Sequence, residues 1–220
     1  MARSHRAFVL RHTRITPVPG VAGLRLHLAS EVLPLWHAVQ EELDDPDAPL
    51  PYWAFAWAGG LALACYLAEH PELVAGRRVF DFATGSGLVA IACARAGAAE
   101  VTGSDIDPFA AAAVEVNARA NGVRVGFVGR DLLEEPPPDV DVLLAGDTWY
   151  EGPLAGRVLP WLLSVAASGV EVLVGDPGRR YLPTDALERI ATYPVRTTTE
   201  LEDLALKQGF VYRLRGRGDT

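Results

Sequence analysis

The residues with the clearest chemical potential are a carboxylate and the glycine turn that follows it. Asp81 lies within a short apolar run, Val79 to Ala83, and the chain then turns at Thr84-Gly85-Ser86-Gly87. Glycines let a backbone turn sharply and approach a ligand closely, and N–H groups at the start of a helix carry partial positive charge. The pattern predicts a nucleotide-like ligand at this turn.

Two classes of cofactor fit the turn. Gly85, Gly87 and Ala90 match a relaxed dinucleotide fingerprint. Asp105 lies 18 residues after Gly87, close to where an acid would hold a ribose. Asp81 favours the other class, because an anionic carboxylate beside the turn suits a cationic ligand better than a pyrophosphate. S-adenosylmethionine carries a sulfonium and an ammonium and has no phosphate, so it is the expected cofactor.

Polar residues recur where the predicted strands end, and ligands of open parallel sheets bind beyond those ends. These residues are Thr84, Ser86, Asp105, Asp107, Arg130, Asp131, Asp147 and Asp176. We expect Asp105 to accept both ribose hydroxyls. For Asp107, capping of the following helix is at least as good an interpretation. Asp131 either meets the adenine amino group or lies in water.

A second chemically rich stretch is GDTWYEGP, from Gly146 to Pro153. Methyl transfer to an amine is an in-line displacement, so catalysis consists mostly of aligning the amine, the methyl carbon and the sulfur. A lysine must arrive neutral, although its pKa in solution is about 10.4. Asp147 or Glu151 would attract the ammonium, while burial against Trp149 and Tyr150 favours loss of its proton. Capping of the next helix is the alternative role for Glu151.

Composition limits the classes of protein to which the chain can belong. It has 220 residues, of which 50% are hydrophobic, and a formal net charge of -8. This predicts one globular unit with no membrane span. The acidic charge argues against nucleic acid and favours a basic partner. Cys65 and Cys93 are expected to be buried thiols in a reducing, cytoplasmic setting. The five histidines have no metal-ligand spacing, so no metal is expected.

The N-terminal part is predicted to cover the catalytic domain. Arg14 to Leu28 is expected to be extended around a Pro-Gly turn, and an amphipathic helix with Ser30 as its N-cap is expected to lie over the main sheet. Residues 1–50 would form this cover and residues 51–220 the catalytic domain, as a single globular unit.

Four aromatic residues precede Gly59: Tyr52, Trp53, Phe55 and Trp57. They could form a packed plug beneath the cover, or at least one indole could line the cleft, where an electron-rich face suits a sulfonium or an amine. Both interpretations stay open from the sequence.

From Val79 the chain alternates between apolar runs and helical patterns, which indicates an α/β fold with a parallel sheet. The predicted strands are Val79–Ala83, Val101–Ile106, Val125–Val128, Val140–Gly146 and Val170–Gly175. The predicted helices between them are Leu88–Ala96, Phe109–Asn121 and Leu154–Ala167. A short helix, Asp185–Ala191, and two β-rich stretches, Val195–Thr199 and Phe210–Leu214, are predicted to follow.

Several stretches resemble the seven-strand class I methyltransferases. DFATGSG resembles their first motif, SDIDP their ribose-binding acid, and GDTWYE the D-x-x-Y-[DE] signature of their protein-lysine branch. PYWAFAWAGG, DIDPFAAAAVEVNA and VGDPGRRYLP are similar to the electron transfer flavoprotein β-subunit lysine methyltransferases, notably bacterial members. The likeness spans nearly the whole chain. Thr148-Trp149 departs from the pattern and leaves the role of Trp149 open.

The resemblance implies a Rossmann-like sheet of order 3-2-1-4-5-7-6 and S-adenosylmethionine as the cofactor. The predicted cofactor-binding residues are Trp57, Asp81, Ala83, Thr84, Gly85, Ser86, Gly87, Asp105, Ile106, Asp107, Arg130, Asp131, Leu132 and Asp147. The predicted catalytic residues are Asp147, Tyr150 and Glu151, and the predicted substrate-binding residues are Trp149, Tyr150 and Glu151.

The expected function is therefore methylation of lysine on the β subunit of electron transfer flavoprotein, or on another basic protein. A small-molecule N-methyltransferase on the same fold is the first alternative, and a dinucleotide-binding oxidoreductase is the second. A protein that binds the cofactor without turnover is the third.

Overall fold

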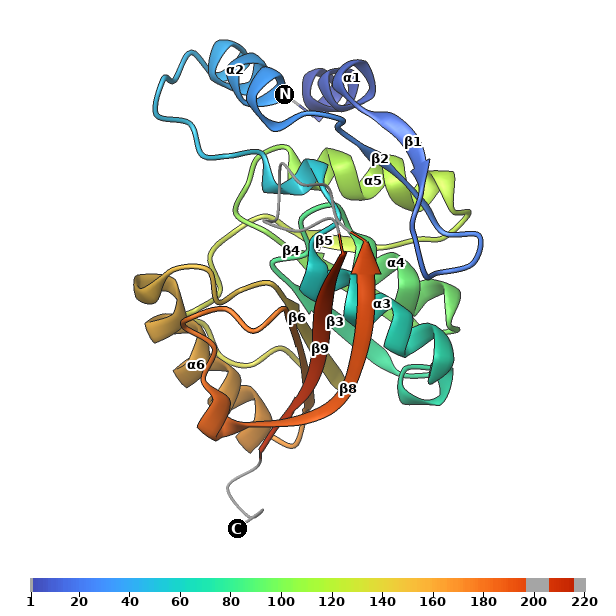
Figure 1. The fold of residues 1–220 in the computed structure, drawn as a ribbon, viewed down its shortest axis with the longest axis vertical. Coiled ribbons are helices and arrows are strands. Elements are labelled where there is room, and N and C mark those ends of the chain that lie inside the picture. The colour runs from blue at the N-terminus through green and yellow to red at the C-terminus, as the bar shows by residue number, and fades with distance from the viewer. Residues whose placement is uncertain (1, 197–205, 216–220) are drawn as a thin grey trace.

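A seven-stranded sheet forms the centre of the computed structural model, which describes residues 2–196 and 206–215 (Figure 1). Its strands are β3 (Arg78–Phe82), β4 (Glu100–Ser104), β5 (Gly126–Val128), β6 (Val142–Gly146), β7 (Glu171–Asp176), β8 (Leu187–Arg196) and β9 (Leu206–Leu214). They lie in the order β5-β4-β3-β6-β7-β9-β8, and only the two pairings that involve β9 are antiparallel. Counted within this sheet alone the order is 3-2-1-4-5-7-6, because β1 and β2 form a separate hairpin.

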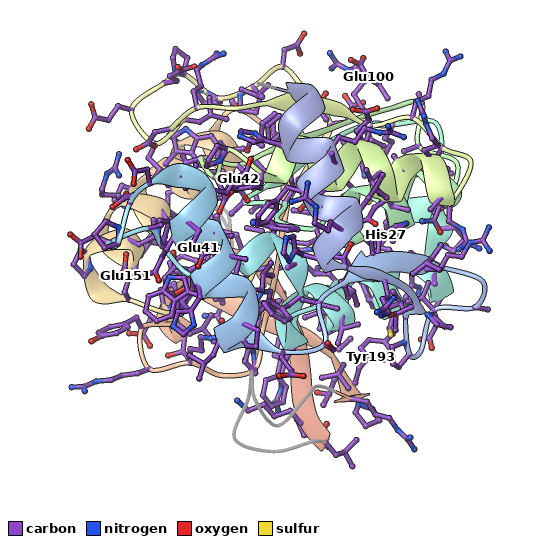
Figure 2. All side chains as sticks on the ribbon, turned by 90° about the horizontal axis from the view of Figure 1, so that it is seen from above. His27, Glu41, Glu42, Glu100, Glu151 and Tyr193 are labelled. Atoms are coloured by element: carbon purple, nitrogen blue, oxygen red, sulfur yellow. The ribbon has the colours of Figure 1, made fainter. Side chains whose placement is uncertain are left out.

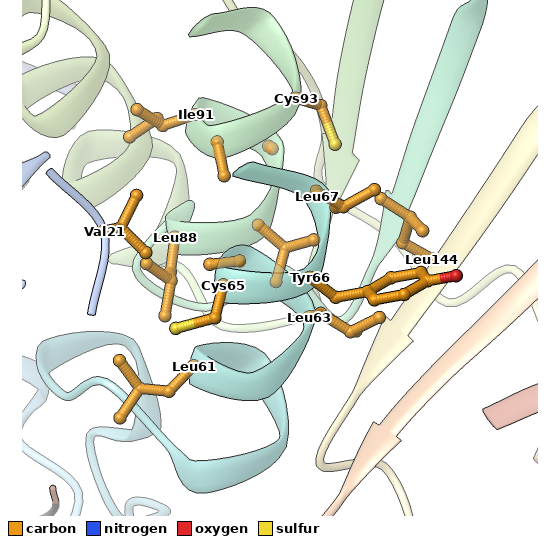
Figure 3. Close-up of a cluster of buried hydrophobic side chains, with 14 of the residues drawn as sticks. Val21, Leu61, Leu63, Cys65, Tyr66, Leu67, Leu88, Ile91, Cys93 and Leu144 are labelled. Carbon is orange, nitrogen blue, oxygen red and sulfur yellow. The ribbon is translucent and has the colours of Figure 1, made fainter. Parts of the chain in front are cut away.

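Helices cover both faces of the sheet, as the alternation of side chains along the strands requires. α3 (Ala58–Glu69) and α4 (Leu88–Arg95) share one apolar cluster with Val79 of β3, and α6 (Gly152–Ala167) shares another with Phe80. Figure 3 shows part of the first cluster. Cys65 and Cys93 lie within it as buried free thiols, as the sequence predicts. No helix in the described part of the chain is long and apolar enough to cross a membrane.

The N-terminal segment forms α1 (Ala2–His12), β1 (Arg14–Pro17), β2 (Arg25–Leu28) and α2 (Val32–Leu43). The extended hairpin was predicted, whereas α1 was not. The predicted cap is wrong: Glu31, not Ser30, precedes α2, and it makes no side-chain capping hydrogen bond. Nor does the segment lie across the face of the sheet. Its helices α1 and α2 share a third apolar cluster with α5 (Ala110–Ala120) and the short helix η1 (Tyr52–Ala54) (Figure 1). The buried hairpin residues between Val18 and Leu26 belong to the first cluster, with α3 and α4.

One predicted element near the C-terminus is wrong. The helix expected at Asp185–Ala191 is a single 3₁₀ turn, Thr184–Ala186, followed directly by strand β8. The strand pairs with β9 from Leu187 to Arg196, so ladder hydrogen bonds override the local helical preference. The expected stretch Val195–Thr199 begins inside β8, and its residues 197–199 lie outside the described part of the chain.

Candidate functional site

A cavity of about 490 Å³ opens at the carboxyl ends of β3, β4 and β6. The predicted site residues that line it are Trp57, Asp81, Ala83, Thr84, Gly85, Ser86, Asp105, Ile106, Asp107, Arg130, Asp131, Leu132, Asp147 and Tyr150. Three further predicted residues, Gly87, Trp149 and Glu151, do not line it. The rule that ligands bind beyond the carboxyl ends of parallel strands thus brings most of the predicted residues to one cavity.

Asp81 supplies a buried carboxylate to this cavity. Its Oδ2 accepts a 2.5 Å hydrogen bond from the Thr84 hydroxyl and a 3.0 Å bond from the Ala90 N–H, while Oδ1 has no partner among the described residues. Burial raises the pKa of Asp81 to about 7, against these two hydrogen bonds, which lower it. A group that stabilises the charged form of Asp81 is therefore missing from the protein alone, and a cation in the cavity would supply it.

Asp105 joins the ends of β3 and β4. Its Oδ2 accepts a hydrogen bond from the Gly85 N–H at 2.9 Å and its Oδ1 accepts one from the Asp107 N–H at 3.0 Å. Each oxygen retains a lone pair, so both can still accept a hydroxyl, which suits a ribose diol. Burial raises the pKa of Asp105. Asp107 Oδ1 accepts the Phe109 N–H at 2.8 Å, but the N-cap of α5 is Phe109 itself, so Asp107 is not the capping residue considered from the sequence.

A side chain of α5 holds the glycine turn in place by hydrogen bonding. The amide of Asn117 is fully buried, donates to the Ser86 carbonyl at 2.8 Å and accepts the His27 N–H at 2.6 Å. This side chain connects the N-terminal hairpin to the turn. Gly85 and Gly87 both have positive φ, and so does Ala83, at 55°. A non-glycine residue in this region is strained, and such strain concentrates at ligand sites.

Asp147 follows β6 with a positive φ of 60°, and its carboxylate is engaged on both oxygens. Oδ1 accepts the Gly59 N–H at 3.1 Å, Oδ2 accepts the Gly60 N–H at 2.7 Å, and the guanidinium of Arg179 also donates to Oδ1. The sequence did not single out Arg179. It follows Asp176 at the end of β7, so the rule that selected Asp176 could also have found it.

Glycines bring α3 close enough to the sheet for these contacts. A Cβ atom built on Gly59 would lie 2.2 Å from the carbonyl oxygen of Gly175 in β7, and one built on Gly146 would lie 3.2 Å from Gly60. No side chain fits between these backbones. The approach places the first N–H groups of α3, the positive end of its dipole, on the Asp147 carboxylate.

The aromatic segment before α3 divides between the two roles considered for it. Trp53 has the role of the packed plug: it is 1% exposed and stacks on Phe109, with ring centroids 5.7 Å apart. Trp57 lines the cavity and lies beside Tyr52, with ring centroids 5.6 Å apart, and Tyr52 lies 5.4 Å from Tyr150. Burial raises the pKa of Tyr150 to about 12, so its phenol is neutral at physiological pH.

Two predicted substrate-binding residues need correction or refinement. Trp149 is fully buried in the cluster beneath α6 and cannot contact a substrate, because the chain turns its indole inward. Glu151 is exposed at the N-cap of α6, where its side chain makes no capping hydrogen bond. Burial is the main cause that raises the pKa of Tyr52, and the charge of Glu151 adds to it. For Tyr150 the causes are burial first, then Tyr52, then Glu151. Glu151 therefore lies near the cavity.

The far end of the cavity is lined by exposed ion pairs and apolar groups. Asp131 accepts 2.7 Å and 3.0 Å hydrogen bonds from Arg157 and the Leu133 N–H. These contacts, the backbone bond first, lower the pKa of Asp131. Ile106 is 76% exposed in the cavity lining and Leu132 is buried there. An apolar pair of this kind suits the faces of an adenine ring.

The lining fits S-adenosylmethionine in its chemistry. Asp81 offers an unpartnered oxygen to a cation, Asp105 offers two acceptors to a diol, and Ile106 offers an apolar face to a base. Among the described residues, no group of three or more His, Cys, Asp or Glu could hold a metal ion.

Comparisons with known proteins agree with this chemistry. A sequence profile described as ribosomal protein L11 methyltransferase (PrmA) matches residues 64–146. The electron transfer flavoprotein beta subunit lysine methyltransferase of Xenopus laevis is 33% identical over 213 residues, which cover 94% of this chain and 85% of that protein.

Two solved structures share the fold. A putative RNA methyltransferase from Pyrococcus horikoshii matches with a TM-score of 0.59 at 14% identity, covering 80% of this chain and 91% of that one. The magnesium protoporphyrin IX methyltransferase of Synechocystis, solved with S-adenosylmethionine bound, matches with a TM-score of 0.50 at 19% identity, covering 70% and 76%.

Proposed function

The chain belongs to the electron transfer flavoprotein β-subunit lysine methyltransferase family, and we propose that it methylates lysine on the β subunit of an electron transfer flavoprotein. Family membership makes it an S-adenosylmethionine-dependent methyltransferase. The observation that carries the substrate proposal is the 33% identity that extends over 94% of the chain.

The cavity mouth supports a lysine substrate. Tyr52, Trp57 and Tyr150 form an aromatic entrance, which suits the aliphatic stem of a lysine. In the view from above, Glu151 lies on the same side of the molecule as Glu41 and Glu42 of α2 (Figure 2). These exposed carboxylates would attract a basic surface around the target lysine.

The chain's own residues position the reactants. S-adenosylmethionine, when bound, would supply a methyl group on a cationic sulfur, and the sulfur would leave as the thioether of S-adenosylhomocysteine when an amine attacks the methyl carbon. Asp81, Gly85 and Asp105 would hold it, and the aromatic entrance would align the amine with it. Asp147 already accepts three hydrogen bonds, so we assign it to positioning, and the amine proton goes to water.

Two finer expectations remain predictions. The Xenopus relative is an animal protein, so the bacterial grouping expected from the sequence rests on the resemblance alone. A cytoplasmic location is likewise a prediction. The division into a cover at residues 1–50 and a catalytic domain at residues 51–220 is a proposal, which the contacts of α1 and β2 with α5 support as one globular unit.

The proposed substrate can be tested with a labelled methyl donor. Purified enzyme is incubated with labelled S-adenosylmethionine and either the flavoprotein β subunit, ribosomal protein L11 or free lysine. We expect label in the β subunit alone. Label in L11 or free lysine, with none in the β subunit, would contradict the proposal, provided that calorimetry shows the enzyme binding S-adenosylhomocysteine.

A further inference from the structure

Arg179, Asp147 and Asp176 form a buried charge cluster, of which Arg179 and Asp147 line the cavity. The Arg179 guanidinium donates to Asp147 and lies 3.3 Å from Asp176 Oδ2. The three side chains are 18%, 11% and 0% exposed. Asp176 in turn accepts the Gly178 and Arg179 N–H groups at 2.7 Å and 2.6 Å, which fixes the loop that carries the arginine.

The cluster adjoins the place where a substrate amine must react. Asp147, Tyr150 and Arg179 all line the cavity beside the glycine turn. Other titratable groups around the cluster come from several elements: Tyr52 of η1, Asp105 after β4, Glu151 before α6 and Tyr212 of β9. Burial and Glu151 raise the pKa of Tyr52, whereas Arg179 acts in the opposite direction, so the field of Arg179 reaches the aromatic entrance.

The charges decide which form of a lysine the site prefers. Two carboxylates without a cation would stabilise an ammonium, which has no lone pair for methyl transfer. Arg179 compensates one of them, and the N–H groups of Gly59 and Gly60 disperse the charge further. The site therefore has a weaker preference for the charged lysine than its two aspartates alone would give.

We propose that Arg179 is a positioning residue that compensates the charge of Asp147 and so allows the substrate lysine to bind as the neutral amine. This inference rests on the proposed function. It assigns a role to a residue outside the predicted catalytic set, and the role is electrostatic, so its effect depends on pH.

The test is the pH profile of kcat/KM on the flavoprotein β subunit. Arg179→Gln should move the half-maximal point upward by about one pH unit, at the low end of shifts caused by a neighbouring charge. The loss near neutral pH should therefore be about tenfold and should be recovered at high pH. Arg179→Lys retains the charge and should keep the wild-type half-point. Arg180→Gln is the matched control, because Arg180 lies on the same loop, stacks on Tyr181 and should cause no shift.

A uniformly lower rate with an unmoved half-point in Arg179→Gln would show a merely structural role and overturn the inference. If that variant does not fold, Asp147→Asn provides the same test with the opposite sign. Its half-maximal pH should fall below that of the wild type. An equal or higher half-maximal pH would contradict the inference. Wild-type enzyme that binds S-adenosylhomocysteine but methylates no lysine of the β subunit at any pH would overturn the proposed function and this inference together. If the wild type is active and the half-maximal pH of Arg179→Gln equals that of the wild type, the inference alone is overturned.

Discussion

Asp81 is 1% exposed and faces the cavity with one unpartnered oxygen, so its ionisation should control binding of a cationic cofactor. With a pKa of about 7 in the free protein, affinity for S-adenosylmethionine should rise roughly eightfold between pH 6 and pH 7.5 if only the ionised form binds. Isothermal calorimetry across this range measures it. Asp81→Asn should bind about tenfold or more weakly at pH 7.5 and lose the pH dependence; a variant with undiminished affinity would refute this role.

The same shift makes a prediction for stability. A carboxyl group whose folded pKa is raised stabilises the fold below its unfolded pKa, and this contribution is lost as pH rises through the folded pKa. For Asp81 the window runs from 3.8 to about 7. Urea unfolding of the cofactor-free protein should therefore show Asp81→Asn gaining stability relative to wild type as pH rises through this window. A constant difference between the two proteins would contradict the raised pKa.

Tyr150 is expected to act through its ring. Because its pKa is raised to about 12, the phenol cannot serve as a base at neutral pH. Tyr150→Phe should retain kcat/KM within about threefold, whereas Tyr150→Ala removes the ring contact with Tyr52 and should lose about tenfold or more. Steady-state kinetics on the β subunit distinguishes them. A phenylalanine variant as impaired as the alanine variant would point to the hydroxyl instead.

At this scale, the sequence predicted which residues line the cavity where their place at the carboxyl end of a strand decides it, within β3 for Asp81 and directly after β4 and β6 for Asp105 and Asp147. Asp81, Asp105 and Asp147 all line the cavity because parallel strands end at one edge of the sheet. Side-chain direction was not predictable: Trp149 and Tyr150 are neighbours, yet one is buried beneath α6 and the other lines the cavity. Arg179 follows β7 as Asp176 does, but its contact with Asp147 was not predictable, because it joins residues 32 positions apart.

Helix α3 is the element that holds the inner end of the site, and its glycines make this possible. Gly59→Ala would place a methyl group 2.2 Å from the Gly175 carbonyl oxygen, so we expect a loss of about 3 kcal/mol or more in the free energy of unfolding. Gly156→Ala in α6 is the matched control. It meets nothing within 4 Å and should stabilise by about 0.5–1 kcal/mol.

Urea denaturation at equilibrium measures both glycine variants. The loss in Gly59→Ala should come with a lower kcat, since the N–H groups of Gly59 and Gly60 would move away from Asp147. Equal stability for the two variants would show that the close approach of α3 to β7 does not exist in solution.

The elements predicted well are those whose pattern is decided locally. The strands from β3 to β7 are apolar runs between breakers, and their predicted bounds lie within about two residues of the observed ones. The first half of β8, Leu187 to Ala191, was misread as part of a helix because Asp185–Ala191 has helix-favouring residues, and pairing with β9 makes it a strand. α1 gave no clear signal, since its stability comes from packing on α5.

For the molecule as a whole, the cavity is lined by segments spread from Pro49 to Arg179, so ligand binding should stabilise the entire fold. S-adenosylhomocysteine at 100 times its Kd should add about 2.7 kcal/mol and raise Tm by roughly 6 °C for a chain of this size. Differential scanning calorimetry measures the shift. NADH at the same concentration should leave Tm unchanged; a shift with NADH and none with S-adenosylhomocysteine would favour the oxidoreductase alternative.

The account depends most on the identity of the atom that receives the methyl group. Intact-mass spectrometry of the flavoprotein β subunit after incubation with enzyme and S-adenosylmethionine, followed by fragmentation, locates it. We predict mass gains of whole methyl groups, all on lysine side chains, that Asp81→Asn greatly reduces. No mass gain with cofactor-binding enzyme, or methyl groups on residues other than lysine, would contradict the proposal.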